Sequence, residues 1–103
     1  MITYEGGTFR LFDALTILRF YATNKYTSFR VEGREHLTEE SLASLEARLA
    51  RHGFVRVHRA ELVNARAVRA FLRDGGACGI ELTDGPSIPA SRRLVAEVRR
   101  ALG

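Results

Sequence analysis

Residues 54–64 constrain the fold of this chain more than any other stretch. Apolar residues alternate there as in a strand with a buried face, at Val55 and Val57 and again at Leu62 and Val63. Arginine, histidine and asparagine side chains are interleaved with them and bring hydrogen-bond donors to the same strand. Burying such donors costs free energy unless they find partners. The segment therefore indicates a strand whose polar groups are used by something outside the fold.

The length of the chain limits it to a simple organisation. With 103 residues it can bury one core but is too short for separate catalytic and regulatory domains, so we expect a single domain over residues 1–103. The 46% apolar content argues against disorder, and no apolar run approaches the length of a membrane span. Cys78 is the only cysteine and no signal peptide is visible, which together predict a cytoplasmic location.

Positive charge is concentrated in the second half of the chain. Residues 1–50 carry six cationic against seven acidic side chains, whereas residues 51–103 carry ten against five, for a net charge of +4. All but one of the cations are arginines, whose planar guanidinium groups bind phosphate or guanine edges with two hydrogen bonds. This distribution favours an anionic partner for the second half.

Short apolar runs separated by turn residues predict strands along most of the chain. The expected strands are residues 9–12, 17–21, 26–31, 54–58, 77–82 and 87–89. Turns are expected at Asp13-Ala14 and at residues 23–25, 32–35, 74–76 and 84–85, where Gly, Asn and Asp gather. Most of these strands follow one another without a long helix between them, which predicts antiparallel pairing.

Two segments have the 3.6-residue apolar period of a helix. Residues 39–51 are expected to follow Thr38 as N-cap and to end at Gly53, with Leu42, Leu45 and Leu49 on one face and Leu37 packed against Leu42. Residues 92–102 are expected to follow Ser91 as cap, with Leu94, Val95, Val98 and Leu102 facing inward.

Several short motifs occur in an order known from one protein family. They are Ile17-Leu18, Ala22-Thr23-Asn24-Lys25-Tyr26, the 54–64 segment, Leu82-Thr83-Asp84-Gly85 and Ile88-Pro89-Ala90-Ser91-Arg92-Arg93. With them the chain resembles LytTR-type DNA-binding domains, output modules of bacterial two-component response regulators, from about Tyr4 to Leu102. The resemblance implies a mainly β fold, an elongated stack of short antiparallel sheets with one amphipathic helix and a short C-terminal helix. It also implies a strand at residues 67–72, which propensity alone leaves open between strand and helix.

The resemblance further implies that connecting segments contact double-stranded DNA. The expected contacts are Asn24, Lys25, Tyr26, Thr27, His58, Arg59, Ser91, Arg92 and Arg93, and the candidates for phosphate contacts are Arg56, Arg66 and Arg69. Arg92 and Arg93 have support of their own, because cations in a first helical turn oppose the helix dipole by roughly 0.3 to 1 kcal/mol each. A local rule broken in this way often marks function. We expect loops and strand ends to read the major groove and control transcription.

Each of these residues also has an ordinary structural interpretation. Residues 24–27 fit a polar hairpin turn, His58 fits a strand histidine with its hydrogen bonds satisfied, and Arg59 fits an ion pair with Glu61. Arg92 and Arg93 fit a solvated helix surface. Asn64 is expected to form a turn instead of contacting a ligand.

The sequence lacks the patterns of other function classes. The three histidines and Cys78 have no metal-ligand spacing, and neither a nucleophile elbow nor a phosphate-binding or dinucleotide-binding loop occurs. We therefore expect no enzyme, cofactor, metal site or small-molecule substrate. A homodimer or two copies on repeated DNA sites fits the resemblance. The alternative function is a stand-alone interaction module that binds a regulatory protein partner or a membrane inhibitor.

Overall fold

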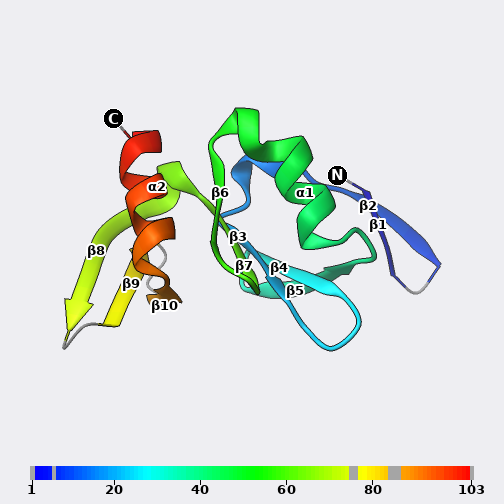
Figure 1. Ribbon diagram of the computed structural model, residues 1–103. Helices are drawn as coiled ribbons and strands as arrows, with labels where there is room; N and C mark the ends of the chain where they lie inside the picture. The colour runs from blue at the N-terminus through cyan, green and yellow to red at the C-terminus, as the bar shows by residue number, and fades with distance from the viewer. Residues whose placement is uncertain (1, 6, 75–76, 84–86, 103) are drawn as a thin grey trace.

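The structure, a computed structural model, describes residues 2–5, 7–74, 77–83 and 87–102 (Figure 1). Its strands are β1 (Ile2–Glu5), β2 (Thr8–Leu11), β3 (Arg19–Ala22), β4 (Thr27–Val31), β5 (Arg34–Thr38), β6 (Phe54–His58), β7 (Glu61–Asn64), β8 (Val68–Asp74), β9 (Ala77–Leu82) and β10 (Ser87–Ala90). Its helices are α1 (Leu42–Leu49) and α2 (Arg92–Leu102), with 3-10 turns at η1 (Ala14–Thr16), η2 (Ala50–His52) and η3 (Ala65–Ala67).

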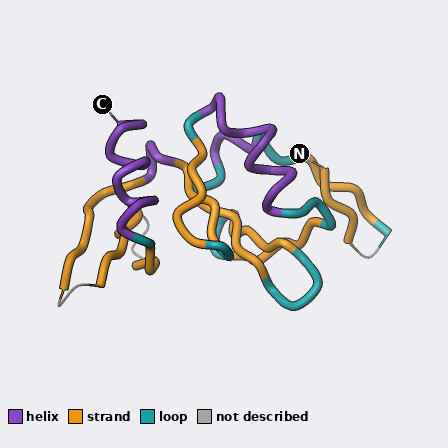
Figure 2. Tube along the Cα trace, in the orientation of Figure 1, coloured by secondary structure: helices purple, strands orange, loops and turns teal. Residues whose placement is uncertain are grey.

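The strands form antiparallel sheets that follow one another along the molecule. A five-stranded sheet has the order β5-β4-β3-β7-β6, a three-stranded sheet has the order β10-β9-β8, and β1 pairs with β2. Figure 2 shows strands at both ends and in the middle of the molecule, and it shows α1 and α2 in separate places. The molecule measures 47 × 25 × 23 Å. The expected mainly β, elongated stack of antiparallel sheets with one amphipathic and one C-terminal helix is confirmed.

Strands β6 and β7 form a wall between two hydrophobic clusters. Phe54 and Leu62 belong to the first cluster, with Phe20, Phe29 and the apolar face of α1. Val57 and Val63 belong to the second cluster, whose other members come from η3 and the three-stranded sheet, with Val95 of α2 packed against it. Successive side chains of a strand point to opposite faces, so adjacent apolar residues such as Leu62 and Val63 contribute to both clusters.

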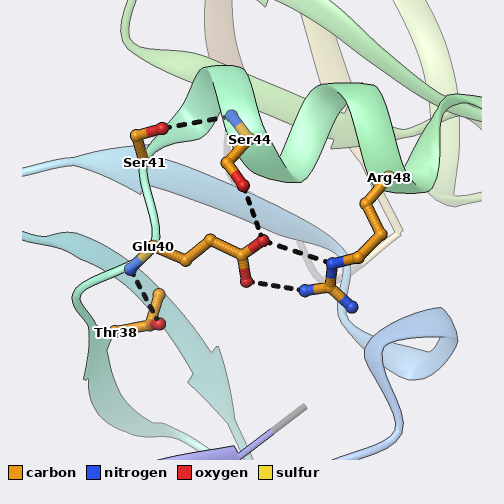
Figure 3. Close-up of polar contacts among 5 residues, drawn as sticks. All are labelled: Thr38, Glu40, Ser41, Ser44 and Arg48. Carbon is orange, nitrogen blue, oxygen red and sulfur yellow. Dashed lines mark hydrogen bonds and ion pairs between the residues drawn. The ribbon is translucent and has the colours of Figure 1, made fainter.

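Helix α1 begins three residues later than the sequence predicted. Ser41, not Thr38, is the N-cap, and its hydroxyl accepts a hydrogen bond from the Ser44 amide at 3.1 Å (Figure 3). Thr38 pairs with Thr27 in the sheet, which keeps it extended, and its hydroxyl accepts the Glu40 amide at 3.2 Å. The three leucines of the expected apolar face are buried, and Gly53 ends the segment with a φ of 88°.

Glu40 lies in the turn before α1 and holds the beginning of that helix. Its carboxylate accepts hydrogen bonds from the Ser44 hydroxyl at 2.9 Å and from Arg48 Nη2 at 2.7 Å (Figure 3). Burial would raise the pKa of Glu40, but the hydrogen bonds from Arg48 and Ser44 outweigh it and hold that pKa below its ordinary value. The expected helix over residues 39–51 included Glu40, and this part of the prediction was wrong.

Other differences from the expected elements arise from sheet pairing. β1 was not expected, and β5 begins at Arg34, where a four-residue turn was expected; only Glu32 and Gly33 turn, with φ of 53° and 79°. Leu37 is 40% exposed within β5 and does not join Leu42 in the core. The strand implied at residues 67–72 is confirmed as β8. The predicted turns at 75–76 and 84–85, and the side chains of Leu94, Val98 and Leu102, lie outside the described residues.

Candidate nucleic-acid interface

Three connecting segments meet at one end of strands β6 and β7. The Ala22 amide at the end of β3 donates to the Ala60 carbonyl in the β6–β7 turn at 2.9 Å. The Ser91 amide, just before α2, donates to the Val57 carbonyl near the end of β6 at 3.3 Å. In Figure 1 the β3–β4 loop, the β6–β7 turn and the beginning of α2 all lie along the lower side of the molecule. We call this surface the loop edge: residues 23–26, 59–60 and 91–93.

The β6–β7 turn is held by hydrogen bonds to its backbone. His58 Nδ1 accepts the Ala60 amide at 3.2 Å, so it carries no proton in this arrangement. Arg56 Nε donates to the His58 carbonyl at 3.1 Å, and Arg56 Nη2 donates to the Arg59 carbonyl. With its backbone fixed in this way, the turn carries the exposed side chain of Arg59. His58 itself is half-buried and bonded to the turn through Nδ1, and its contact with DNA stays a prediction.

The β3–β4 loop is closed by Thr23. Its amide and hydroxyl both donate to the Tyr26 carbonyl, at 2.9 and 3.1 Å. Asn24 and Lys25 therefore occupy the middle of a tight turn, with their side chains exposed, and Tyr26 is 44% exposed. Thr27 is only 5% exposed and belongs to strand β4, so the structure does not place it on the exposed part of the loop, and a DNA contact by Thr27 stays a prediction.

The beginning of α2 completes the loop edge. The helix starts at Arg92, directly after Ser91, and the side chains of Ser91, Arg92 and Arg93 are exposed. The first amides of a helix have no partners within it, and together with the helix dipole they attract anions. Two arginines added at this position make it more positive still.

The loop edge carries cations without acidic neighbours in its own segments. Its charged residues are Lys25, Arg59, Arg92 and Arg93, and it contains neither Asp nor Glu. Among the described residues, the side chains of Lys25, Arg59 and Arg93 make neither a hydrogen bond nor an ion pair. Their donors are therefore available to an anionic ligand.

Glu61 begins β7 beside this surface, but its charge is engaged elsewhere. Arg19 Nη1 donates to both carboxylate oxygens, at 2.8 and 2.9 Å, and the guanidinium lies 4.3 Å from the centre of the Tyr21 ring. Burial raises the pKa of Glu61, although the Arg19 hydrogen bonds oppose the rise. The structure shows this pair in place of the alternative in which Arg59 pairs with Glu61. Arg19 carries no local signal of this role in the sequence, because its partner lies 42 residues away.

The structure does not bring the other expected phosphate contacts to the loop edge. The Ala65 amide donates to the Gly53 carbonyl at 2.8 Å, so Arg66 lies at the opposite end of β6 and β7. Arg69 follows shortly after in β8 and pairs with Glu81 at 3.4 Å. Arg56 lies in the β6 wall, where Nη1 donates to Glu46 Oε1 at 3.0 Å besides its bonds to the turn. Strand direction thus separates Arg66 and Arg69 from the loop edge, and internal acceptors hold Arg56. A phosphate contact by any of the three stays a prediction.

Asn64 has a structural role, as the sequence predicted. Its amide nitrogen donates to the Leu15 and Ile17 carbonyls at 3.2 and 3.4 Å, and its oxygen accepts the Arg66 amide at 3.1 Å. Among the residues the structure describes, no group of three or more His, Cys, Asp or Glu side chains is placed to hold a metal ion. Within the same residues, neither helix has the length and apolar character that crossing a bilayer requires.

Comparison with known proteins gives matches of three kinds. The family model described as LytTr DNA-binding domain matches residues 8–103. The chain is 28% identical over 102 residues to the heme-containing CO-sensing transcriptional regulator RcoM 2 of Paraburkholderia xenovorans, covering 97% of this chain and 38% of that protein. It is 36% identical over 73 residues to the transcriptional regulatory protein BtsR of Escherichia coli K12, covering 70% of this chain and 29% of BtsR.

A solved structure matches the fold along the whole chain. It is a LytTr DNA-binding domain from Bacillus cereus, with a TM-score of 0.83 at 21% sequence identity, covering 100% of this chain and 95% of that one. The curated relatives are much longer than this chain, which spans 38% and 29% of their lengths.

Proposed function

Because this chain belongs to the LytTr DNA-binding domain family, we propose that it binds double-stranded DNA sequence-specifically and regulates transcription through the loop edge. The single observation that carries the proposal is the convergence of three exposed, cation-bearing segments at one end of β6 and β7. Phosphates supply most of the affinity of such interfaces, and side chains that reach base edges supply the specificity. The family and its regulatory relatives point to a binding protein, not an enzyme.

The three segments have different roles in this proposal. Arg59 and Arg93 read base edges in the major groove, because each guanidinium is exposed and has no partner among the described residues. Asn24, Lys25 and Tyr26 contact the backbone or a base from the β3–β4 loop. Ser91 and Arg92, with the amides that begin α2, hold a phosphate. Loops and strand ends thus enter the groove in place of a recognition helix.

Selection of DNA from a random pool tests the proposal directly. We expect the chain to enrich one motif, and the number and spacing of repeats in it to report whether two copies bind together. Affinity for the selected duplex should fall with salt, with a log-log slope of about 0.9 per phosphate neutralised. A pool without enrichment, or affinity that does not respond to salt, would contradict sequence-specific duplex binding.

A matched pair of variants assigns the binding to the loop edge. Arg93→Ala removes an exposed arginine from that surface, and Arg66→Ala removes one from the opposite end of β6 and β7. We expect the first to weaken binding to the selected motif and the second to leave it nearly unchanged. Equal losses would place the interface elsewhere.

One observation favours a second function, that of a protein-interaction module. Phe71 and Leu72 on edge strand β8 are each 38% exposed, and with Cys78, Val95 and Arg99 they line a hollow of about 330 Å³. Exposed apolar surface of this kind often marks a protein contact. In this case the chain would retard no DNA fragment in a gel at low salt, and Leu72→Ser would abolish binding of a regulatory partner while leaving the fold intact.

A further inference from the structure

Arg56 is a cation that the fold surrounds with acceptors. It lies in β6 with a side chain 24% exposed, between α1 and the β6–β7 turn. Its three donor nitrogens bind Glu46 of α1 and the carbonyls of His58 and Arg59. A planar guanidinium can satisfy three acceptors at once in fixed directions, which an ammonium cannot.

The backbone around Arg56 departs from a regular ladder. Arg56 pairs with Leu62 and His58 pairs with Glu61, so the register shifts by one residue at Val57. Such a bulge leaves backbone groups without ladder partners. Here the Val57 carbonyl accepts the Ser91 amide at 3.3 Å, which attaches the beginning of α2 to the same place. The guanidinium of Arg56 donates hydrogen bonds to the carbonyls of His58 and Arg59, which follow the bulge.

We propose that Arg56 is a positioning residue, which fixes the β6–β7 turn so that Arg59 is presented to DNA in one orientation. This inference rests on the proposed function of the loop edge. The turn contains only Arg59 and Ala60; its two carbonyls accept from Arg56 and Ala22, and the Ala60 amide donates to His58. The backbone is thereby held while the Arg59 side chain stays exposed. Preorganisation of this kind spares the complex the entropy of ordering the loop on binding.

The geometry argues against a direct phosphate contact for Arg56. Glu46 neutralises the guanidinium at 3.0 Å, and the remaining donors point to backbone carbonyls of the turn. A phosphate would have to displace these partners and leave carbonyls unpaired. The predicted consequence is that Arg56 acts on DNA only through Arg59.

Four variants test this with the selected duplex and a scrambled duplex. Arg56→Met keeps the length of the side chain but loses the donors, and Arg56→Lys keeps the charge but loses the fork. We expect each to weaken binding to the selected duplex roughly 5- to 10-fold, with little change on the scrambled duplex. Arg59→Ala and the double variant Arg56→Met/Arg59→Ala complete a cycle. The Met change should have no further effect once Arg59 is gone.

Other outcomes have distinct meanings. A salt slope that falls by about 0.9 in Arg56→Met, losses that multiply in the double variant, or full binding by Arg56→Lys would overturn the proposal in favour of a phosphate contact. Lower stability with unchanged binding would reduce Arg56 to a structural residue and overturn it equally. Failure of the unmodified chain to enrich any sequence would instead refute the proposed function.

A measurement without DNA examines the turn itself. The amide of Ala60 is hydrogen-bonded to His58 within the turn that Arg56 holds. We expect Arg56→Met, and more weakly Glu46→Gln, to shift the amide resonances of Arg59 and Ala60 and to speed their hydrogen exchange. Unchanged resonances and exchange in folded Arg56→Met would show that the guanidinium does not fix the turn.

Discussion

Arginine has opposite roles in two neighbouring regions, the wall formed by β6 and β7 and the loop edge at its end. In the wall, Arg56 binds three acceptors, and its strand neighbours Val55 and Val57 both pack with the second cluster. At the loop edge, three residues further along, Arg59 is exposed and its side chain has no partner among the described residues. An arginine in this fold is therefore structural or available to a ligand according to its place on the strand, not its neighbours in sequence.

The largest expected effect belongs to the wall. Phe54 is 2% exposed and its ring lies 5.9 Å from that of Phe20, so Phe54→Ala should lower the free energy of unfolding by about 3 to 5 kcal/mol. Urea unfolding measures it. The affinity of the molecules that remain folded should be unchanged. A loss below about 1 kcal/mol would mean that the wall does not separate two packed cores.

Next comes the polar residue that ends the wall. Asn64 is 7% exposed and bonds three backbone groups, so Asn64→Ala should lower the free energy of unfolding by about 1 to 3 kcal/mol. Calorimetry or urea unfolding gives the value. An unchanged midpoint would show that water satisfies the Leu15 and Ile17 carbonyls as well as this side chain does.

The loop edge should show the reverse pattern. Arg93→Ala should cost about 1 to 3 kcal/mol of binding to the selected motif and relax specificity at one base position. Its unfolding free energy should stay within about 0.5 kcal/mol of the unmodified chain, because the side chain is exposed. Fluorescence titration and urea unfolding on the same sample separate the two quantities. Arg66→Ala is the control, and a large loss of stability in Arg93→Ala would contradict the contrast.

The smallest effect is expected where an ion pair is formed but remains exposed. Arg48 is 46% exposed beside Glu40, so Arg48→Ala should cost less than about 1 kcal/mol of stability. The folded pKa of Glu40 is lowered, so its contribution is present at neutral pH and is lost as pH falls through the ordinary carboxyl range toward that lowered value. Comparing unfolding of the variant and the unmodified chain from neutral to acidic pH checks the sign. A stability difference that grows on acidification would contradict it.

Local patterns were enough to predict most strands, but they did not show which polar side chains are bonded within the fold and which are exposed to solvent. The alternation in residues 54–64 predicted a strand, yet both of its faces are buried, so the idea that its polar groups serve an outside partner holds at most for the turn. Arg56 finds Glu46 across the Gly53 bend, a pairing that no local spacing reveals. Thr38 and Ser41 are equally good caps in sequence, and only the ladder with Thr27 decides between them.

The sequence pointed to the segments that form the loop edge, but it did not show which other arginines lie outside that surface. Resemblance placed Arg59 and Arg93 in connecting segments, and the structure brings these segments together through the Ala22 and Ser91 amides. Arg66 and Arg69 were candidates for phosphate contacts, and the structure places neither in these segments. The direction of β7 carries the chain away from the turn before either residue is reached.

The shared wall has a consequence for how this molecule comes apart. Each of the two hydrophobic clusters includes side chains from one face of β6 and β7. If the elements around one cluster unfolded and took these strands with them, the other cluster would be exposed to solvent as well. The chain should unfold as a single cooperative unit, and the backbone amides of β6 and β7 should undergo hydrogen exchange only through global unfolding.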